Sequence, residues 1–235
     1  GGKSPAVVAP GALTARTVNS LAFGKLSNAG QTCIAPDFLL IHQDDVENFI
    51  ALYDAAVKAF YPDGPTSHDY GAIINDRHYH RLQDLLTDAQ ARGARIVPVG
   101  HRPDSAVERP KTLAPTLIVG APDDSRIMQE EIFGPLIGVT TFKDEAEALA
   151  LANDTEFGLG AGLWTRDINR AYRMGRAIKA GRVWTNCYHL YPAHAAFGGY
   201  KNSGIGRETH KAALSHYQQV KNLLVSYDAK PLGLF

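Results

Sequence analysis

Cys33 is the residue of this sequence best suited to covalent chemistry. It lies in Asn28-Ala-Gly-Gln-Thr-Cys-Ile-Ala-Pro, between a segment with helical periodicity and an apolar run. Gly30 and Pro36 interrupt regular structure on either side, so the thiol is expected at a junction between a helix and a strand. Backbone N–H groups at such a junction can stabilise a thiolate and later an oxyanion, as nucleophilic catalysis requires. On composition alone the favoured alternative is a small, buried, apolar side chain.

The other candidate ligands and nucleophiles have weaker surroundings. Cys187 follows an apolar run, and no neighbour in the sequence would lower the pKa of its thiol, so a structural role is favoured. His78 and His80 are two positions apart on a predicted helix and point to different faces. Two cysteines give neither a disulfide framework nor the four ligands of a structural zinc site, so we expect no metal.

Composition describes a neutral globular chain. The 235 residues contain 24 Lys and Arg and 24 Asp and Glu, which gives a formal net charge of zero. No basic surplus favours nucleic acid or an anionic membrane as partner. No apolar run approaches the ~18–20 residues of a spanning helix, and the first residues lack the features of a signal peptide. These observations predict a cytoplasmic protein that acts on a small molecule.

Helical periodicity and apolar runs alternate along the chain. Five segments carry helical periodicity, with inward positions at 18–26, 46–60, 79–89, 145–152 and 167–180. Asp44 or Asp45 is expected to cap the second helix, and Gly93 and Gly181 to end the third and the last. The predicted strands are Pro5–Ala9, Phe38–His42, Arg95–Val99, Thr116–Val119, Ile137–Phe142, Gly160–Trp164 and Val183–Thr185.

This alternation predicts an α/β fold, a three-layer, open and mostly parallel sheet with helices on both faces. Gly100–Pro115 is expected to be a long surface loop, and Cys187–Gly206 a second irregular segment. Segments of this length are usually functional or mobile. A short helix is expected near Glu208–His216. The alternating strand Val220–Tyr227 has no partner nearby in sequence and is a candidate for pairing with another domain or subunit.

Four motifs occur in the order in which the aldehyde dehydrogenase superfamily has them, and the match spans essentially the whole chain. They are Gly1-Gly-Lys-Ser-Pro, Asn28-Ala-Gly-Gln-Thr-Cys33, Glu130-Glu-Ile-Phe-Gly-Pro135, and Phe197-Gly-Gly with Lys201-Asn-Ser-Gly-Ile-Gly-Arg-Glu208. The sequence around Ile34 resembles the coniferyl- and fatty-aldehyde branches. Trp184-Thr-Asn-Cys-Tyr and the tail from His216 are similar to bacterial acetaldehyde dehydrogenases. The resemblance implies the catalytic-domain fold of that family and an NAD- or NADP-dependent oxidation of an aldehyde to a carboxylic acid.

The resemblance also implies roles for single residues. Cys33 matches the nucleophile, which forms a thiohemiacetal and then a thioester. Glu131 matches the carboxylate that binds the nicotinamide ribose, and Phe133 the ring beside the nicotinamide. Phe197 matches an aromatic wall of the aldehyde pocket. Two supporting residues complete the set: Asn186 matches a residue that braces the cysteine loop, and Gly2 belongs to the Gly-Gly-Lys motif.

Two of these roles have a plainer alternative. Glu130 and Glu131 are alternatively a solvated pair before a strand, the commoner fate of adjacent acids, and Phe197 is about equally a core aromatic beside a turn. In the family, the general-base Glu stands two positions before the first Gly of Gly-Gly-Lys, and the oxyanion Asn and the dinucleotide-binding domain lie further upstream. This sequence starts at Gly1. The resemblance therefore implies an isolated catalytic domain (1–210) with a C-terminal helix end and oligomerisation strand (211–235), weak or inactive alone.

Two other function classes stay open. The chain is alternatively a non-catalytic domain that self-associates through Val220–Tyr227. A third interpretation is an acyltransferase-like protein that forms a thioester on Cys33 without a cofactor, because slow hydrolysis would favour transfer.

Overall fold

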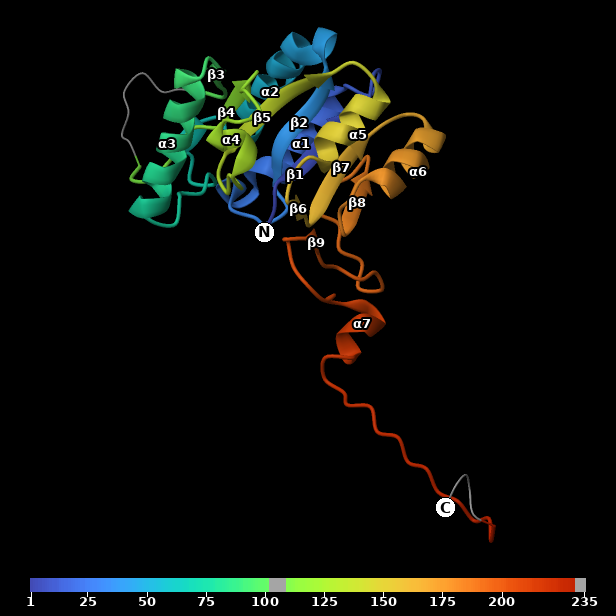
Figure 1. The fold of residues 1–235 in the computed structure, drawn as a ribbon. Helices are drawn as coiled ribbons and strands as arrows, with labels where there is room; N and C mark the ends of the chain where they lie inside the picture. The colour runs from blue at the N-terminus through green and yellow to red at the C-terminus, as the bar shows by residue number, and fades with distance from the viewer. Residues whose placement is uncertain (102–108, 231–235) are drawn as a thin grey trace.

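The strands predicted from the sequence form one sheet. The computed structural model describes residues 1–101 and 109–230, so residues 102–108 of the predicted surface loop lie outside the described residues. Within the described part, a seven-stranded sheet has the order β3-β4-β5-β2-β1-β7-β8 (Figure 1). The strands are β1 (Ser4–Val8), β2 (Pro36–His42), β3 (Arg95–Pro98), β4 (Thr116–Val119), β5 (Leu136–Phe142), β7 (Gly160–Trp164) and β8 (Arg182–Thr185). Strands β3 and β4 are antiparallel, whereas all other pairs are parallel.

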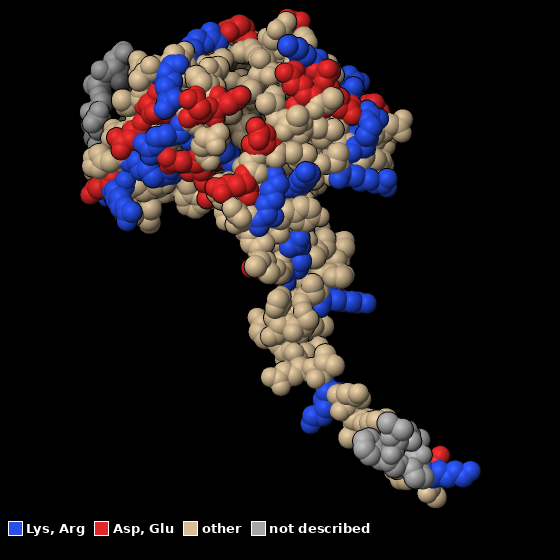
Figure 2. Space-filling model, viewed as in Figure 1, with Lys and Arg blue, Asp and Glu red and all other residues tan. Residues whose placement is uncertain are grey.

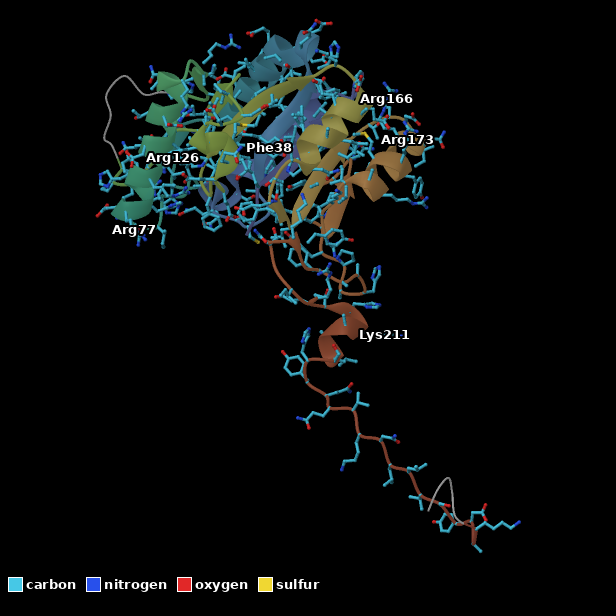
Figure 3. The ribbon with its side chains drawn as sticks, in the orientation of Figure 1. Phe38, Arg77, Arg126, Arg166, Arg173 and Lys211 are labelled. Carbon is cyan, nitrogen blue, oxygen red and sulfur yellow. The ribbon has the colours of Figure 1, made fainter. Side chains whose placement is uncertain are left out.

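Helices cover both faces of this sheet. Alternate residues of β2 show this directly: Leu39 and Ile41 pack with α1 (Ala15–Leu26) and α2 (Val46–Phe60). Phe38 and Leu40 pack on the opposite face with α5 (Glu145–Asn153) and α6 (Ile168–Ala177). Two further helices, α3 (Asp76–Ala91) and α4 (Arg126–Gln129), pack beside β4. The predicted three-layer α/β fold is confirmed, and Figure 3 shows Phe38 inside the body with Arg77 and Arg173 at its periphery.

Of the predicted helix ends, one is wrong. Helix α2 begins with Asp45 at the N-cap position, as predicted, although Asp45 makes no side-chain capping hydrogen bond and belongs to a 3-10 turn, Gln43–Asp45, capped by the His42 side chain. Helix α6 ends at Ala177, and the N–H of Gly181 donates to the carbonyl of Gly158 instead of closing the helix. Gly93 does follow α3 with a φ of 92°, as predicted for a left-handed ending.

The parallel strands place four distant segments at one edge of the sheet. Because β1, β2, β5 and β7 run in the same direction, the residues just before each of them meet at the amino edge. These segments are residues 1–3, 31–35, 130–135 and 157–159. Three of the four recognised motifs supply these segments, and the fourth reaches the same edge, where the Ser203 hydroxyl accepts a bond from the N–H of Gly158 at 2.8 Å. The N-terminus marks this edge in Figure 1.

The C-terminal part leaves the body of the molecule. Strands β6 (Phe157–Gly158) and β9 (Tyr200–Lys201) form a small second sheet, after which α7 (His210–Leu214) and an extended tail project away (Figure 1). Residues 220–227 form no strand here and are exposed, so their pairing with another chain stays a prediction. Figure 2 shows charges of both signs interspersed over the viewed face of the body, whereas this tail is mostly uncharged.

Candidate active site at the amino edge of the sheet

The Cys33 loop has an unusual backbone. After α1, the three residues Asn28, Ala29 and Gly30 all have positive φ, at 54°, 52° and 74°. This left-handed run turns the chain sharply, so that partly buried Cys33 lies between α1 and β2. Such strain persists only where the surroundings fix it, and it concentrates at functional sites. The predicted position of Cys33 at a helix–strand junction is confirmed.

The side chain of Gln31 fixes this loop to the segment before α3. Its Oε1 accepts a hydrogen bond from the N–H of Ile74 at 2.9 Å, and its Nε2 donates to the carbonyl of Ala72 at 3.0 Å. Both bonds cross more than forty residues of sequence. Gln31 therefore holds the loop before Cys33 against the backbone of Ala72 and Ile74.

Direct backbone contact joins the Cys33 loop to the segment that carries Glu131 and Phe133. A Cβ added to Gly30 would overlap the carbonyl oxygen of Gly134, so only glycine allows this approach. The structure therefore brings the predicted nucleophile and the predicted cofactor residues together, although about a hundred residues separate them in sequence.

Glu131 faces the first residues of the chain. Its Oε1 accepts a hydrogen bond from the backbone N–H of Gly2 at 2.9 Å. Burial raises the pKa of the Glu131 carboxyl, and the bond from Gly2 partly offsets this. Glu131 is therefore not one of a solvated acidic pair, because Glu130 alone turns outward to Arg126 and Arg81. The pKa of the Glu130 carboxyl is lowered, first by its hydrogen bond from Arg126.

Phe133 sits at a strained position next to α3. Its φ is 57°, and its carbonyl oxygen lies 2.6 Å from Nε2 of His78. The two rings meet edge to face with centroids 6.0 Å apart. Arg81, one turn further along α3, donates to the carbonyl of Ile132. Helix α3 thus holds this segment from outside, and the ring of Phe133 remains partly exposed at the amino edge.

A buried ionic cluster, which sequence reasoning missed, holds the same segment from inside. The Asp37 carboxylate lies 3.3 Å from Nζ of Lys25 and 3.6 Å from Nζ of Lys3, and it accepts a bond from the N–H of Ile132. Nζ of Lys3 also donates to the carbonyls of Ile127 and Glu130. Burial lowers the pKa of both lysines. Both lysine side chains are buried, which the sequence pattern gave no reason to expect.

Aromatic side chains from the segment after β8 form a wall beside Cys33. The hydroxyl of Tyr188 is fully buried and donates to the carbonyl of Ile34 at 2.6 Å. Burial raises the pKa of Tyr191, and the nearby Cys33 raises it further. The ring of Tyr191 meets that of Phe197 edge to face, with centroids 5.5 Å apart. Phe197 is partly buried and packs on the same core as Cys33, while the hollow that it lines does not include Cys33, so its place in an aldehyde pocket stays a prediction.

This wall exists because the chain doubles back. The residues after β8 start at the opposite, carboxyl edge of the sheet and return past α1, where Nε2 of His189 lies 3.0 Å from the carbonyl of Gly24. Tyr188 packs against Trp164 and Trp184, whose ring centroids are 5.9 and 4.8 Å from its own. Tyr188 and Tyr191 lie in an irregular segment without a periodic signal, so only their place just before the Phe197-Gly-Gly motif could have singled them out.

Asn186 and Cys187 lie at the carboxyl edge. The Asn186 carboxamide accepts from the N–H of Thr165 at 2.9 Å and donates to its carbonyl at 2.8 Å. It therefore braces the end of β7, and the expectation that it braces the cysteine loop is not met by these hydrogen bonds. Both residues line an open hollow of about 830 Å³ that does not include Cys33. Burial raises the pKa of Cys187, in keeping with a structural thiol.

Two kinds of feature are absent from the described ranges, 1–101 and 109–230. No three His, Cys, Asp or Glu side chains in them are grouped so that they could hold a metal ion. None of the helices found there has the length and apolar character needed to cross a membrane.

The fold and the site define an α/β protein in which a thiol, a half-buried carboxylate and an aromatic wall meet at the amino edge of a parallel sheet. The chain belongs to the aldehyde dehydrogenase family, whose family model, "Aldehyde dehydrogenase family", matches residues 1–223. It is 55% identical over 212 residues to a protein named acetaldehyde dehydrogenase from Pseudomonas aeruginosa, covering 88% of this chain and 42% of that one. The chain thus spans less than half the length of this relative.

Solved structures of the family agree. An NAD-dependent aldehyde dehydrogenase from Sinorhizobium meliloti superposes with a TM-score of 0.88 at 33% identity, covering 100% of this chain and 46% of that one. A Mycobacterium tuberculosis aldehyde dehydrogenase complexed with NAD+ gives a TM-score of 0.87 at 29% identity, with 98% and 48% covered. The resemblance stated from the motifs is confirmed at the level of family and fold.

Proposed function

We propose that this chain supplies the nucleophile and the aldehyde pocket of an NAD(P)-dependent aldehyde dehydrogenase. The observation that carries the proposal is the contact between Gly30 and Gly134, which brings the Cys33 loop against the segment bearing Glu131 and Phe133. The names of the relatives support a small aldehyde such as acetaldehyde as substrate and NAD as cofactor.

Cys33 carries the bond-forming steps. Its thiolate Sγ attacks the aldehyde carbon, and the carbonyl electrons move to the oxygen, which gives a thiohemiacetal oxyanion within reach of the Cys33 backbone N–H. When NAD(P) is bound, the chemistry it supplies is acceptance of the hydride that leaves this carbon. The oxyanion electrons then re-form the C=O bond, and a thioester remains on Cys33. Attack by water breaks the S–C bond and releases the carboxylic acid and the free thiol.

Glu131 and Phe133 fit one wall of the cofactor site. A carboxylate can accept bonds from two neighbouring hydroxyl groups, as a ribose presents them. One Glu131 oxygen is engaged by Gly2, and the half-buried position keeps the group aimed at the amino edge. The partly exposed ring of Phe133 lies two residues further on, where a planar ring could pack against it. Within residues 1–101 and 109–230 this is the one wall that we assign to a cofactor, and we propose that the chain by itself binds the cofactor weakly and turns over slowly.

The test is detection of an acyl group on Cys33 by intact-mass and peptide mass spectrometry. With acetaldehyde and excess NAD, we expect an acetyl thioester on Cys33 of the chain, absent without NAD and absent in Cys33→Ser. Steady-state NADH formation should stay well below the ~10 s⁻¹ that is ordinary for enzymes. An NAD-dependent acyl group on Cys187, or none on either cysteine, would refute the proposed mechanism.

We also propose that the chain forms a homo-oligomer through residues 220–227. Val220, Leu223 and Tyr227 are at least 80% exposed. Exposed apolar surface of this kind often marks a protein–protein interface. Sedimentation of the chain and of a Leu223→Lys, Val225→Lys variant measures this directly. We expect association in the first and monomers in the second; a monomeric unmodified chain at micromolar concentration would contradict the proposal.

A further inference from the structure

Arg182, the first residue of β8, is anchored in the segment that forms the aromatic wall. Its guanidinium donates to the carbonyls of Leu190 at 3.4 Å, Ala195 at 3.3 Å and Ala196 at 3.1 Å. These acceptors stand on both sides of the Pro192 turn. One planar group therefore ties together two stretches of backbone that would otherwise have independent conformations.

The same guanidinium lies over three aromatic rings. It is 5.8 Å from the ring centroid of Trp184, 6.0 Å from that of Tyr191 and 5.6 Å from that of Phe197. Each contact is attractive, because a cation interacts favourably with the face of an aromatic ring. Arg182 thus contacts both the backbone of this segment and two of its rings, Tyr191 and Phe197.

We propose that Arg182 is a positioning residue that fixes Tyr191 and Phe197 edge to face beside Cys33 and so sets how well the pocket holds the apolar part of an aldehyde. The inference rests on the proposed function, since it takes Cys33 as the nucleophile. Arginine suits the task because its rigid fork serves several carbonyls and stacks on rings at once, which a lysine ammonium cannot do.

Other hydrogen bonds keep this segment folded when Arg182 is changed. Nε1 of Trp184 donates to the carbonyl of Leu190 at 2.9 Å, and the hydroxyl of Thr209 donates to the carbonyl of Ala195 at 2.7 Å. His189 is fixed to α1 independently. Loss of the guanidinium should therefore loosen the rings without unfolding the segment, which separates positioning from general stability.

The test uses two alkylating reagents of different size on the full chain. Iodoacetamide carries no apolar group to contact the rings, whereas N-benzyl-2-iodoacetamide carries a phenyl ring that the proposal places against Tyr191 and Phe197. For Arg182→Met, we expect the half-saturating concentration of the benzyl reagent at Cys33 to rise about 3- to 10-fold. Its maximal rate and the iodoacetamide rate should stay within about twofold of the unmodified chain, as for a change confined to binding.

Arg176→Met is the matched control. Arg176 lies 5.9 Å from the ring centroid of Tyr172 on α6, so it makes the same kind of contact outside the pocket. In the Arg176→Met variant, Cys33 should react with both reagents as it does in the unmodified chain. Arg182→Lys keeps the charge but loses the planar guanidinium. It should also raise the half-saturating concentration of the benzyl reagent, and it serves as the test if Arg182→Met does not fold.

A double-mutant cycle with Tyr191→Ala completes the test. Because both changes act on one ring, their effects on the benzyl reagent should be non-additive. Three results would overturn the role of Arg182. They are additive effects in the cycle, equal effects on the two reagents, and a half-saturating concentration of the benzyl reagent that neither Arg182 variant changes. If Cys187 of the unmodified chain instead reacts before Cys33, the proposed function fails, so the two failures are distinguishable.

Discussion

The carboxylate of Asp37 accepts a hydrogen bond from the backbone N–H of Ile132 at 2.8 Å. Asp37 is the second residue of β2, the strand that follows Cys33, and Ile132 stands between Glu131 and Phe133. With the Gly30–Gly134 contact, this bond makes the two halves of the candidate site one rigid unit. Catalytic groups need such support, because small displacements of a site lower its activity strongly.

Asp37→Ala should destabilise the chain severely. The change leaves Lys3 and Lys25 buried without a counter-charge, and removing one partner of a buried ionic group costs about 3–5 kcal/mol. Urea unfolding followed by circular dichroism measures the loss. Glu47→Gln, which breaks the exposed pair with Arg95, is the control and should change stability by less than ~0.5 kcal/mol. A cost below ~1 kcal/mol for Asp37→Ala would show that the cluster does not hold the site.

Gly30→Ala should slow alkylation of Cys33, whereas Gly93→Ala, a substitution at another glycine with positive φ, should not. Its φ of 74° makes any side chain strained by about 1–2 kcal/mol, and the Cβ would also displace the Gly134 carbonyl. Gly93→Ala has a comparable φ of 92° but meets open space, so it isolates the backbone strain. We expect slower alkylation of Cys33 in Gly30→Ala alone; equal alkylation rates in the two variants would argue against the contact.

Cys33 should react with limiting iodoacetamide before Cys187 at pH 7.5. Burial raises the pKa of the Cys187 thiol above its usual ~8.5, so little thiolate is present at neutral pH. The Cys187 labelling rate should still be increasing as the pH passes 9, since the thiolate fraction increases until the pH exceeds the pKa. Peptide mass spectrometry over this pH range gives both rates. Preferential labelling of Cys187 at pH 7.5 contradicts the assignment.

Glu131→Gln should become more stable relative to the unmodified chain as the pH rises from 4 to 7. Burial raises the folded-state pKa of Glu131 above the ~4.3 of an unfolded chain, so ionisation opposes folding. That penalty is absent below the unfolded pKa and complete above the folded one. Glutamine avoids it and can still accept the bond from Gly2. Because the group is only half-buried, the difference should be under ~1 kcal/mol. A constant difference across this pH range would contradict the predicted cause.

Local patterns predicted most of the secondary structure. The strand predicted at Thr116–Val119 has those bounds in the structure, and the stripe from Val46 to Phe60 coincides with α2. These elements bury long runs of apolar residues, so periodicity reports them directly. The end at Gly181 was wrong because its N–H donates to the carbonyl of Gly158, a contact with another segment that residue type alone does not specify.

The sequence by itself determined the family, the alternation of strands and helices, and the identity of Cys33, Glu131, Phe133 and Phe197 as candidates, because each depends on residues close together in the chain. The tertiary structure decided which of them meet. Parallel pairing in the order β5-β2-β1-β7 gathers segments from residues 1 to 159 at the amino edge. Return of the chain after β8 adds Tyr188 and Tyr191, and brings Tyr191 against Arg182 at the start of β8. Burial converts Lys3, Lys25 and Asp37 from ordinary charged residues into a support for the site. Strand order and burial depend on contacts between distant segments, which no local pattern encodes.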